Sequence, residues 1–205
     1  MKKKILLLTA ASAFLCNCTD HDLQNPDRFS LNPQSVAEWK GFLKTGYFNN
    51  GTIKVESDDI KVENGKVTGG SFNIPVSSII NLNLPTDEIK EQLVHHLQSP
   101  DFFNMALHPN VRYEITDVLP YSATKEGDVV GANYWINGTL TILGRQNPVS
   151  FPAKIVLSGN FLSVEANLKF DRTKWGITYA SDPDLAPENY IEPMIEVHLQ
   201  LSASK

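Results

Sequence analysis

Residues 66–104 of the chain read KVTGGSFNIPVSSIINLNLPTDEIKEQLVHHLQSPDFFN. The first part has the apolar residues of a strand, but their spacing slips from odd to even positions across Gly69-Gly70. Such a slip predicts a β-bulge, and bulges turn the corners of barrels. The second part carries the one convincing helical pattern in the chain. A kinked strand followed by a single helix predicts a closed sheet with one helical excursion.

The helix is expected between Pro85 and Pro100. Thr86 has a hydroxyl that can cap the first turn, where Asp87 and Glu88 also place the negative charge that the helix dipole favours. One apolar stripe runs along this helix, formed by Ile89, Leu93 and Leu97. We therefore expect the helix to cover part of the barrel.

Four later segments alternate apolar and polar residues with a period of two, at residues 130–142, 149–157, 162–170 and 191–201. This period predicts strands with one buried face and one solvated face. Earlier strands are expected at residues 36–43, 47–57, 60–63, 66–77 and 111–119. Asn64-Gly65 predicts a two-residue hairpin, and further turns are expected at residues 144–147 and 158–160.

The fold class that follows is mainly β, an antiparallel lipocalin-like β-barrel of about eight strands with one α-helix inserted. A barrel of this size encloses either a packed core or a cavity for one small ligand. Strand parity directs a set of apolar side chains inward, namely Phe72, Ile74, Tyr134, Ile136, Phe151, Ile155, Leu168, Phe170, Ile195 and Val197. The pattern leaves open whether these side chains touch a ligand or one another.

The N-terminus has the layout of an export signal. Lysines at residues 2–4 precede an apolar run that is too short to span a bilayer, which is typical of a signal peptide over residues 1–17. Leu15 stands three residues before Cys18, as in the lipobox of bacterial lipoproteins, so Cys18 is the expected lipidation site and Cys16 the competing one. The alternative is an ordinary cleaved signal with two incidental cysteines. Residues 18–33 are expected to form a polar tether, and residues 34–205 the barrel domain.

Charge and cysteine content exclude several classes of function. The formal net charge is −5, and loss of the three N-terminal lysines would take it to −8. An acidic chain without a Lys/Arg cluster argues against nucleic acid as a partner and against electrostatic docking on anionic lipid. Both cysteines lie in the N-terminal segment, so disulfides and thiolate chemistry are excluded from the domain.

Several ordered motifs resemble the YceI-like family: TGGSFNIPVSSI from residue 68, HLQSPDFFN from residue 96, GTLTILG from residue 138, VSFP from residue 149, and FDRTKWGITY from residue 170. The resemblance covers residues 36–202. It implies an extended lipocalin-like barrel whose interior holds a polyisoprenoid or a similar long apolar lipid. It also implies export, and dimerisation in some members, so a homodimer is left open.

The sharpest polar cluster is Asp171-Arg172-Thr173-Lys174-Trp175-Gly176. Arg172 and Lys174 are candidates for contact with an anionic head group at the barrel mouth, with Trp175 as a gate lining the ligand. In the alternative, Asp171 and Arg172 pair locally, Trp175 plugs the barrel and Gly176 makes a bend.

Catalytic and metal chemistry are not expected. His95, His96 and His108 are near one another in sequence, but neighbouring helical positions diverge by about 100° and no carboxylate shows ligand spacing. There is no nucleophile elbow and no phosphate-binding Gly-rich loop. We therefore expect no enzyme activity, no metal and no cofactor.

The function that the sequence favours is non-catalytic binding or carriage of a long, polyisoprenoid-like lipid inside the barrel. The protein is expected to be exported and lipid-anchored in the bacterial cell envelope, on the periplasmic side or the outer surface. The alternative is a structural or stress-protective envelope module with a packed barrel and no ligand.

Overall fold

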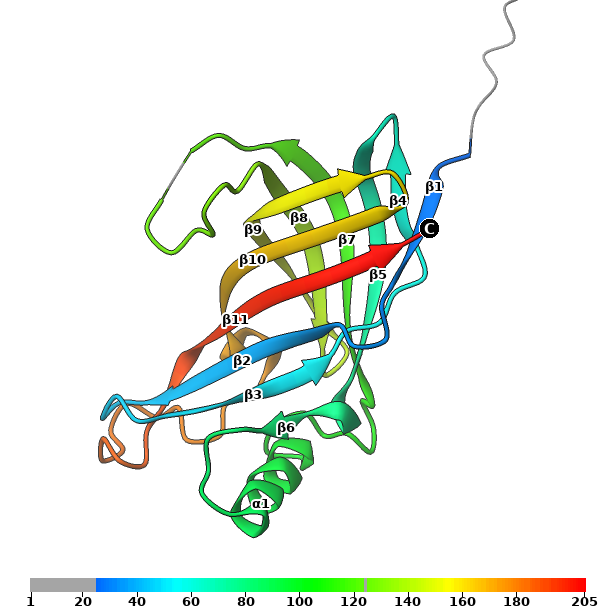
Figure 1. The fold of residues 1–205 in the computed structure, drawn as a ribbon. Helices are drawn as coiled ribbons and strands as arrows, with labels where there is room; N and C mark the ends of the chain where they lie inside the picture. The colour runs from blue at the N-terminus through cyan, green and yellow to red at the C-terminus, as the bar shows by residue number, and fades with distance from the viewer. Residues whose placement is uncertain (1–24, 124) are drawn as a thin grey trace, which may run out of the picture.

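A computed structural model of the protein describes residues 25–123 and 125–205, and within them the chain forms eleven strands and one α-helix (Figure 1). The strands are β1 (Asp27–Leu31), β2 (Val36–Leu43), β3 (Phe48–Lys54), β4 (Ile60–Glu63), β5 (Lys66–Pro75), β6 (Ile80–Asn81), β7 (Asn110–Pro120), β8 (Tyr134–Ile142), β9 (Arg145–Ser158), β10 (Phe161–Asp171) and β11 (Ile191–Ser204). The helix is α1 (Asp87–Gln98), and two 3-10 turns are η1 (Val76–Ser78) and η2 (Arg172–Trp175).

The sheet is antiparallel and closes into a barrel. Its strand order is β1-β4-β5-β7-β8-β9-β10-β11-β2-β3-β6, and β1 pairs with β11 as well as with β4. The second pairing of β1 closes a ring of eight strands. Further along, Glu56 beyond β3 bridges to Asn73 of β5, so the β2–β3 hairpin is joined to the other side of the barrel. The predicted β-barrel with one inserted helix is confirmed.

The bulge predicted at Gly69-Gly70 is confirmed within one residue. Lys61 pairs with Gly69 but Val62 pairs with Val67, so Thr68 is an extra residue in β5. After the bulge β5 changes its partner, since residues from Gly70 onward pair with β7. The strand therefore turns the corner between the two parts of the sheet.

The turn at Asn64-Gly65 is also as predicted, with φ values of 50° and 75° that suit a tight hairpin between β4 and β5. The turn expected at residues 144–147 is wrong by two residues. Leu143 (φ 51°) and Gly144 (φ 71°) make that turn, and β9 begins at Arg145. Sequence cannot easily show this, because an apolar residue rarely takes a positive φ.

Helix α1 begins and ends as the sequence indicates. The Thr86 hydroxyl accepts a 3.3 Å hydrogen bond from the backbone N–H of Ile89, and the Ser99 N–H donates to the carbonyl of His96. The helix lies at one end of the barrel, below β3 and β6 in Figure 1. Leu93 and Leu97 face the barrel interior, whereas Ile89 is 41% exposed. The expected cover over the barrel is therefore present.

The boundary of the predicted tether was placed too late. Residues 27–31 form β1, and Phe29 at its centre is 2% exposed within the core. Its two apolar residues, Phe29 and Leu31, are too few to show a period, so the partners of β1 on β4 and β11 could not be read from sequence. At the start of the first of the four alternating segments, Val130 is 90% exposed and β8 begins only at Tyr134. Cys18 and the signal segment lie outside the described residues.

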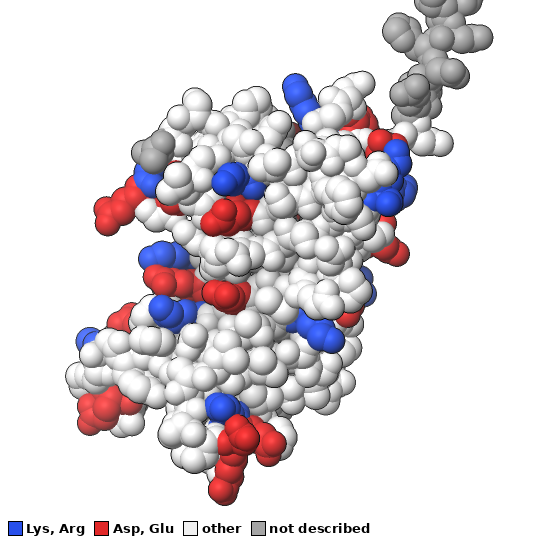
Figure 2. Space-filling view, in the orientation of Figure 1, with Lys and Arg blue, Asp and Glu red and all other residues white. Residues whose placement is uncertain are grey.

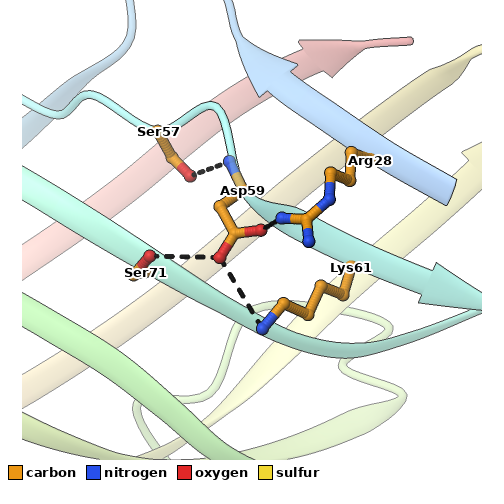
Figure 3. A network of polar contacts seen from close by, with 5 residues as sticks. All are labelled: Arg28, Ser57, Asp59, Lys61 and Ser71. Atoms are coloured by element: carbon orange, nitrogen blue, oxygen red, sulfur yellow. Dashed lines mark hydrogen bonds and ion pairs between the residues drawn. The ribbon is translucent and has the colours of Figure 1, made fainter. Parts of the chain in front are cut away.

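A polar network fixes β1 to the barrel corner (Figure 3). The Arg28 guanidinium pairs with the Asp59 carboxylate, and the Lys61 Nζ lies 3.7 Å from its other oxygen. The Ser71 hydroxyl on β5 donates to the same carboxylate at 3.4 Å. Asp59 thus connects β1, β4 and β5 through contacts with Arg28, Lys61 and Ser71.

Candidate functional site

The barrel interior contains a partly open cavity of about 280 Å³, close to the lower end of the size range of small-molecule sites. Its wall comes from almost every strand and from α1, and it is made nearly entirely of aliphatic and aromatic side chains. The cavity exists because inward residues of facing strands do not fill the barrel to the centre. An apolar space of this kind suits an apolar ligand.

Nine of the side chains predicted to face inward line this cavity: Phe72, Ile74, Ile136, Phe151, Ile155, Leu168, Phe170, Ile195 and Val197. Tyr134 and Trp175 lie outside its lining and pack in the surrounding core. Trp175 is 1% exposed, its indole N–H donates to the Leu140 carbonyl at 2.9 Å, and its ring meets Phe170 edge-on. Trp175 therefore packs behind the cavity wall and does not line the cavity. The ligand-binding role of the nine lining residues remains a prediction.

The cluster at residues 171–176 forms the turn η2. The Asp171 carboxylate accepts hydrogen bonds from the backbone N–H (2.9 Å) and the hydroxyl (2.6 Å) of Thr173. Gly176 ends the turn with φ 89°, as the predicted bend requires. The local ion pair expected between Asp171 and Arg172 is wrong, since the Arg172 side chain points to backbone carbonyls instead.

Arg172 is a buried cation at one end of the cavity, 2% exposed. Its guanidinium donates to the carbonyls of Ile177 (2.8 Å), Ile191 (2.9 Å) and Glu192 (3.3 Å), and so ties η2 to the start of β11. Burial lowers the pKa of this guanidinium from its ordinary value, although an arginine stays charged in proteins. Lys174, the second head-group candidate, is exposed and lies outside the cavity lining.

Two polar lining residues were missed by the sequence analysis, Trp39 on β2 and Asn49 on β3. The indole nitrogen Nε1 of Trp39 and the amide oxygen Oδ1 of Asn49 are buried and have no hydrogen-bond partner within the described residues. The alternation of apolar residues in 36–43 is weak, which concealed the inward direction of Trp39. Asn49 was not among the predicted site residues, because an asparagine before Asn50-Gly51 is typical of a turn.

Tyr113 narrows the cavity from β7. Its hydroxyl donates to the Val149 carbonyl at 3.0 Å, and its ring packs against those of Phe72 and Phe151. Burial raises the pKa of the Tyr113 phenol above its ordinary value, because the phenolate would have to be desolvated. The Tyr113 hydroxyl is therefore already hydrogen-bonded within the wall and is uncharged.

Groups that could perform metal chemistry do not gather in the part of the chain that the structure describes. No set of three or more His, Cys, Asp or Glu side chains among those residues could hold a metal ion. His96 instead contacts the Asp101 carboxylate at 3.1 Å and packs edge-on against Phe102 and Tyr179. On the outer face seen in Figure 2, basic and acidic side chains are intermixed and separated by wide uncharged areas.

Comparison with known proteins identifies the family of the chain. Residues 33–203 match the YceI-like domain. A UPF0312 protein of Shewanella denitrificans is 29% identical over 163 residues, covering 78% of this chain and 76% of the relative. Burkholderia cenocepacia BcnA shares the fold with a TM-score of 0.62 at 15% identity, covering 83% of this chain and 97% of that one.

A second solved structure, a polyisoprenoid binding domain from Saccharophagus degradans implicated in plant cell wall breakdown, has a TM-score of 0.61 at 12% identity. It covers 86% of this chain and 97% of its own. At these identities the two structures establish the shared barrel, and the match over residues 33–203 establishes the kinship. The chain belongs to the YceI-like family.

Proposed function

We propose that the barrel binds a long apolar lipid of the polyisoprenoid kind, without catalysis, and carries or holds it in the cell envelope. The observation that supports this most directly is the apolar cavity inside the barrel, lined by nine of the predicted residues. A filled barrel would have favoured the alternative of a structural module without a ligand. The structural neighbour from Saccharophagus degradans, described as a polyisoprenoid binding domain, supports the same ligand class.

Desolvation supplies the binding energy in this proposal. Each buried methylene contributes about 0.8 kcal/mol, so about ten of them contribute roughly 8 kcal/mol before the costs of association are subtracted. Because association itself costs about 4 kcal/mol or more, micromolar binding without an ionic contact needs about fifteen or more buried methylenes, which a long polyisoprenoid chain supplies. A chain longer than the cavity would leave through an end of the barrel, and α1 covers the end that lies away from the termini (Figure 1).

We further propose that the protein is exported and anchored through Cys18, which precedes the described residues. None of the helices in the described part of the chain is both long and apolar enough to cross a membrane. At the barrel end opposite α1, β1 pairs with the end of β11, and Asp27 at the start of β1 forms an ion pair with Lys205. An anchor at Cys18 would hold the barrel by that end. Labelling with radioactive palmitate, lost in Cys18→Ala and kept in Cys16→Ala, tests the site.

The ligand is tested by native mass spectrometry of the full-length protein purified from its own host, followed by lipid extraction. We expect a mass excess that dissociates as an isoprenoid or similar long-chain lipid. Absence of any co-purifying lipid, together with no uptake of added polyprenols, would contradict the proposal.

A matched pair of variants on β10 makes the test specific to the cavity. Val164 lines the cavity, whereas its neighbour Ser163 faces solvent. Val164→Phe fills the space and should lower lipid uptake by about tenfold or more, because ring and ligand compete for one volume. Ser163→Phe adds the same ring outside and should leave uptake unchanged. Circular dichroism confirms that both variants remain folded.

A further inference from the structure

One part of the cavity wall carries polar atoms that have no hydrogen-bond partner within the described residues. Among the described lining residues, four side chains carry nitrogen or oxygen: Trp39, Asn49, Tyr113 and Arg172. The Tyr113 hydroxyl is taken by the Val149 carbonyl, and the Arg172 guanidinium by three backbone carbonyls. Trp39 Nε1 and Asn49 Oδ1 have no partner within the described residues.

Register places these two side chains together. Trp39 pairs with Gly51 and Gly41 pairs with Asn49 across β2 and β3, so Trp39 and Asn49 are diagonal neighbours on one face. Diagonal neighbours in an antiparallel pair lie about 7–8 Å apart or less, within reach of long side chains. The residues opposite them are both glycines, Gly51 and Gly41, so neither β2 nor β3 places another side chain beside the indole and the amide on this face. The nearest side chain at Gly41 is that of Ile195 on β11, whose Cδ1 lies 3.5 Å from the position a Cβ would take.

Gly51 also fixes the indole. A Cβ at residue 51 would lie 2.8 Å from Trp39 Cζ2 and 1.8 Å from the Ile80 carbonyl oxygen. Only glycine lets the indole lie against β3 while β6 pairs on the other side. The Trp39 indole therefore packs against the backbone of β3, and its Nε1 is buried in the wall.

An unpaired buried donor and acceptor are each costly, so such groups are normally satisfied by protein or ligand. We propose that Trp39 and Asn49 form a polar subsite that binds an uncharged oxygen, a hydroxyl or a carbonyl, at the end of the apolar ligand. This inference rests on the proposed lipid-binding function and specifies the chemistry of the ligand's polar end. An indole N–H donates only, and a carboxamide both donates and accepts. A hydroxyl complements the pair, since it accepts from Trp39 and donates to Asn49.

The subsite also sets the direction of the ligand. Trp39 and Asn49 adjoin β6, which pairs with β3 beside α1. The opposite end of the cavity is lined by Leu31, Ile60 and Val67, which offer no polar side-chain atom. The polar end of the ligand therefore lies near the α1 end, and its apolar tail extends toward β1.

Three probes with one branched isoprenoid skeleton test the subsite: phytanol, the hydrocarbon phytane and the anion of phytanic acid. Each is delivered from cyclodextrin to the full-length protein and measured by calorimetry or tryptophan fluorescence. We expect phytanol to bind about tenfold more tightly than phytane, as one or two net hydrogen bonds would provide. Equal affinities would overturn the subsite and leave lipid binding intact. Failure of all three to bind would overturn the proposed function itself, and tighter binding of the anion would overturn the assignment of an uncharged end.

Variants assign the effect to the two residues. Trp39→Phe keeps an aromatic ring and removes the N–H, and Asn49→Leu keeps the approximate size and removes the amide. Each should lower phytanol affinity about three- to tenfold and leave phytane affinity unchanged, which also shows that the cavity has formed. Trp135→Phe is the control, because the Trp135 N–H donates to Asn137 and the residue lies outside the cavity lining. Equal loss of phytanol and phytane in Trp39→Phe would contradict the subsite.

Discussion

The Tyr113 hydroxyl on β7 donates a 3.0 Å hydrogen bond to the Val149 carbonyl on β9, although β8 lies between those two strands. The ring crosses β8 at Gly138, which pairs with both Ile115 and Val149. A Cβ at Gly138 would lie 2.2 Å from the ring carbon Cζ and 2.7 Å from the backbone oxygen of Glu114. The crossing joins three strands on the inner face and gives one wall of the cavity its shape.

Gly138→Ala should destabilise the protein by about 1–3 kcal/mol, because the new methyl group overlaps the Tyr113 ring and a backbone atom that cannot rotate away. Gly69→Ala is the matched control. Its Cβ would meet only the Lys61 Cδ at an ordinary 3.6 Å, so we expect a change within about 0.5 kcal/mol. Urea denaturation measures both. Equal stabilities for the two variants would show that the crossing is not rigid.

Tyr113 also predicts an alkaline limit to stability. Burial raises the pKa of its phenol in the folded state, so the unfolded chain releases this proton first as the pH rises. The contribution is fully present below the unfolded-state pKa near 10 and is lost progressively above it. In Tyr113→Phe the free energy of unfolding should therefore fall less steeply above about pH 10 than in Tyr47→Phe, which removes an exposed tyrosine. Identical slopes would contradict the buried phenol.

Strand β1 is held by an apolar contact and by an ionic one, and two variants measure their contributions to stability separately. Phe29→Ala should cost about 3–5 kcal/mol, because it removes a ring that is 2% exposed in the core. Arg28→Ala should cost less than about 1 kcal/mol, since the Arg28 side chain is 59% exposed and its pair with Asp59 is screened by solvent. Thermal unfolding ranks the two variants. A larger loss from Arg28→Ala would mean that the network in Figure 3, rather than the buried ring, holds β1.

Features encoded by local pattern could be predicted from sequence, and features encoded by distant pairing could not. The helix, the bulge before Gly70 and the long strands each follow from spacing or capping within a few residues. Strand β1 depends on partners at residues 60–62 and 203–204, and its two apolar residues, Phe29 and Leu31, are too few to establish a period. The role of Trp39 and Asn49 could not be predicted for the same reason. It depends on two side-chain atoms that have no hydrogen-bond partner within the described residues, and this can be seen only once distant strands are in place. Nine inward residues were found because strand parity is local.

Arg172 and Lys174 were both candidates for a ligand head group, and their surroundings predict different roles. Arg172→Met leaves three carbonyls without their donor and should cost about 2–4 kcal/mol in unfolding free energy. Lys174→Met, an equal change in an exposed side chain, should stay within about 0.5 kcal/mol and leave lipid affinity unaltered. Denaturation and phytanic acid binding are measured on both. A structural donor cannot be removed without loosening the elements that it joins. If the Arg172→Met variant kept its stability but lost affinity for the anion alone, Arg172 would therefore bind a charged head group instead of fixing η2 to β11.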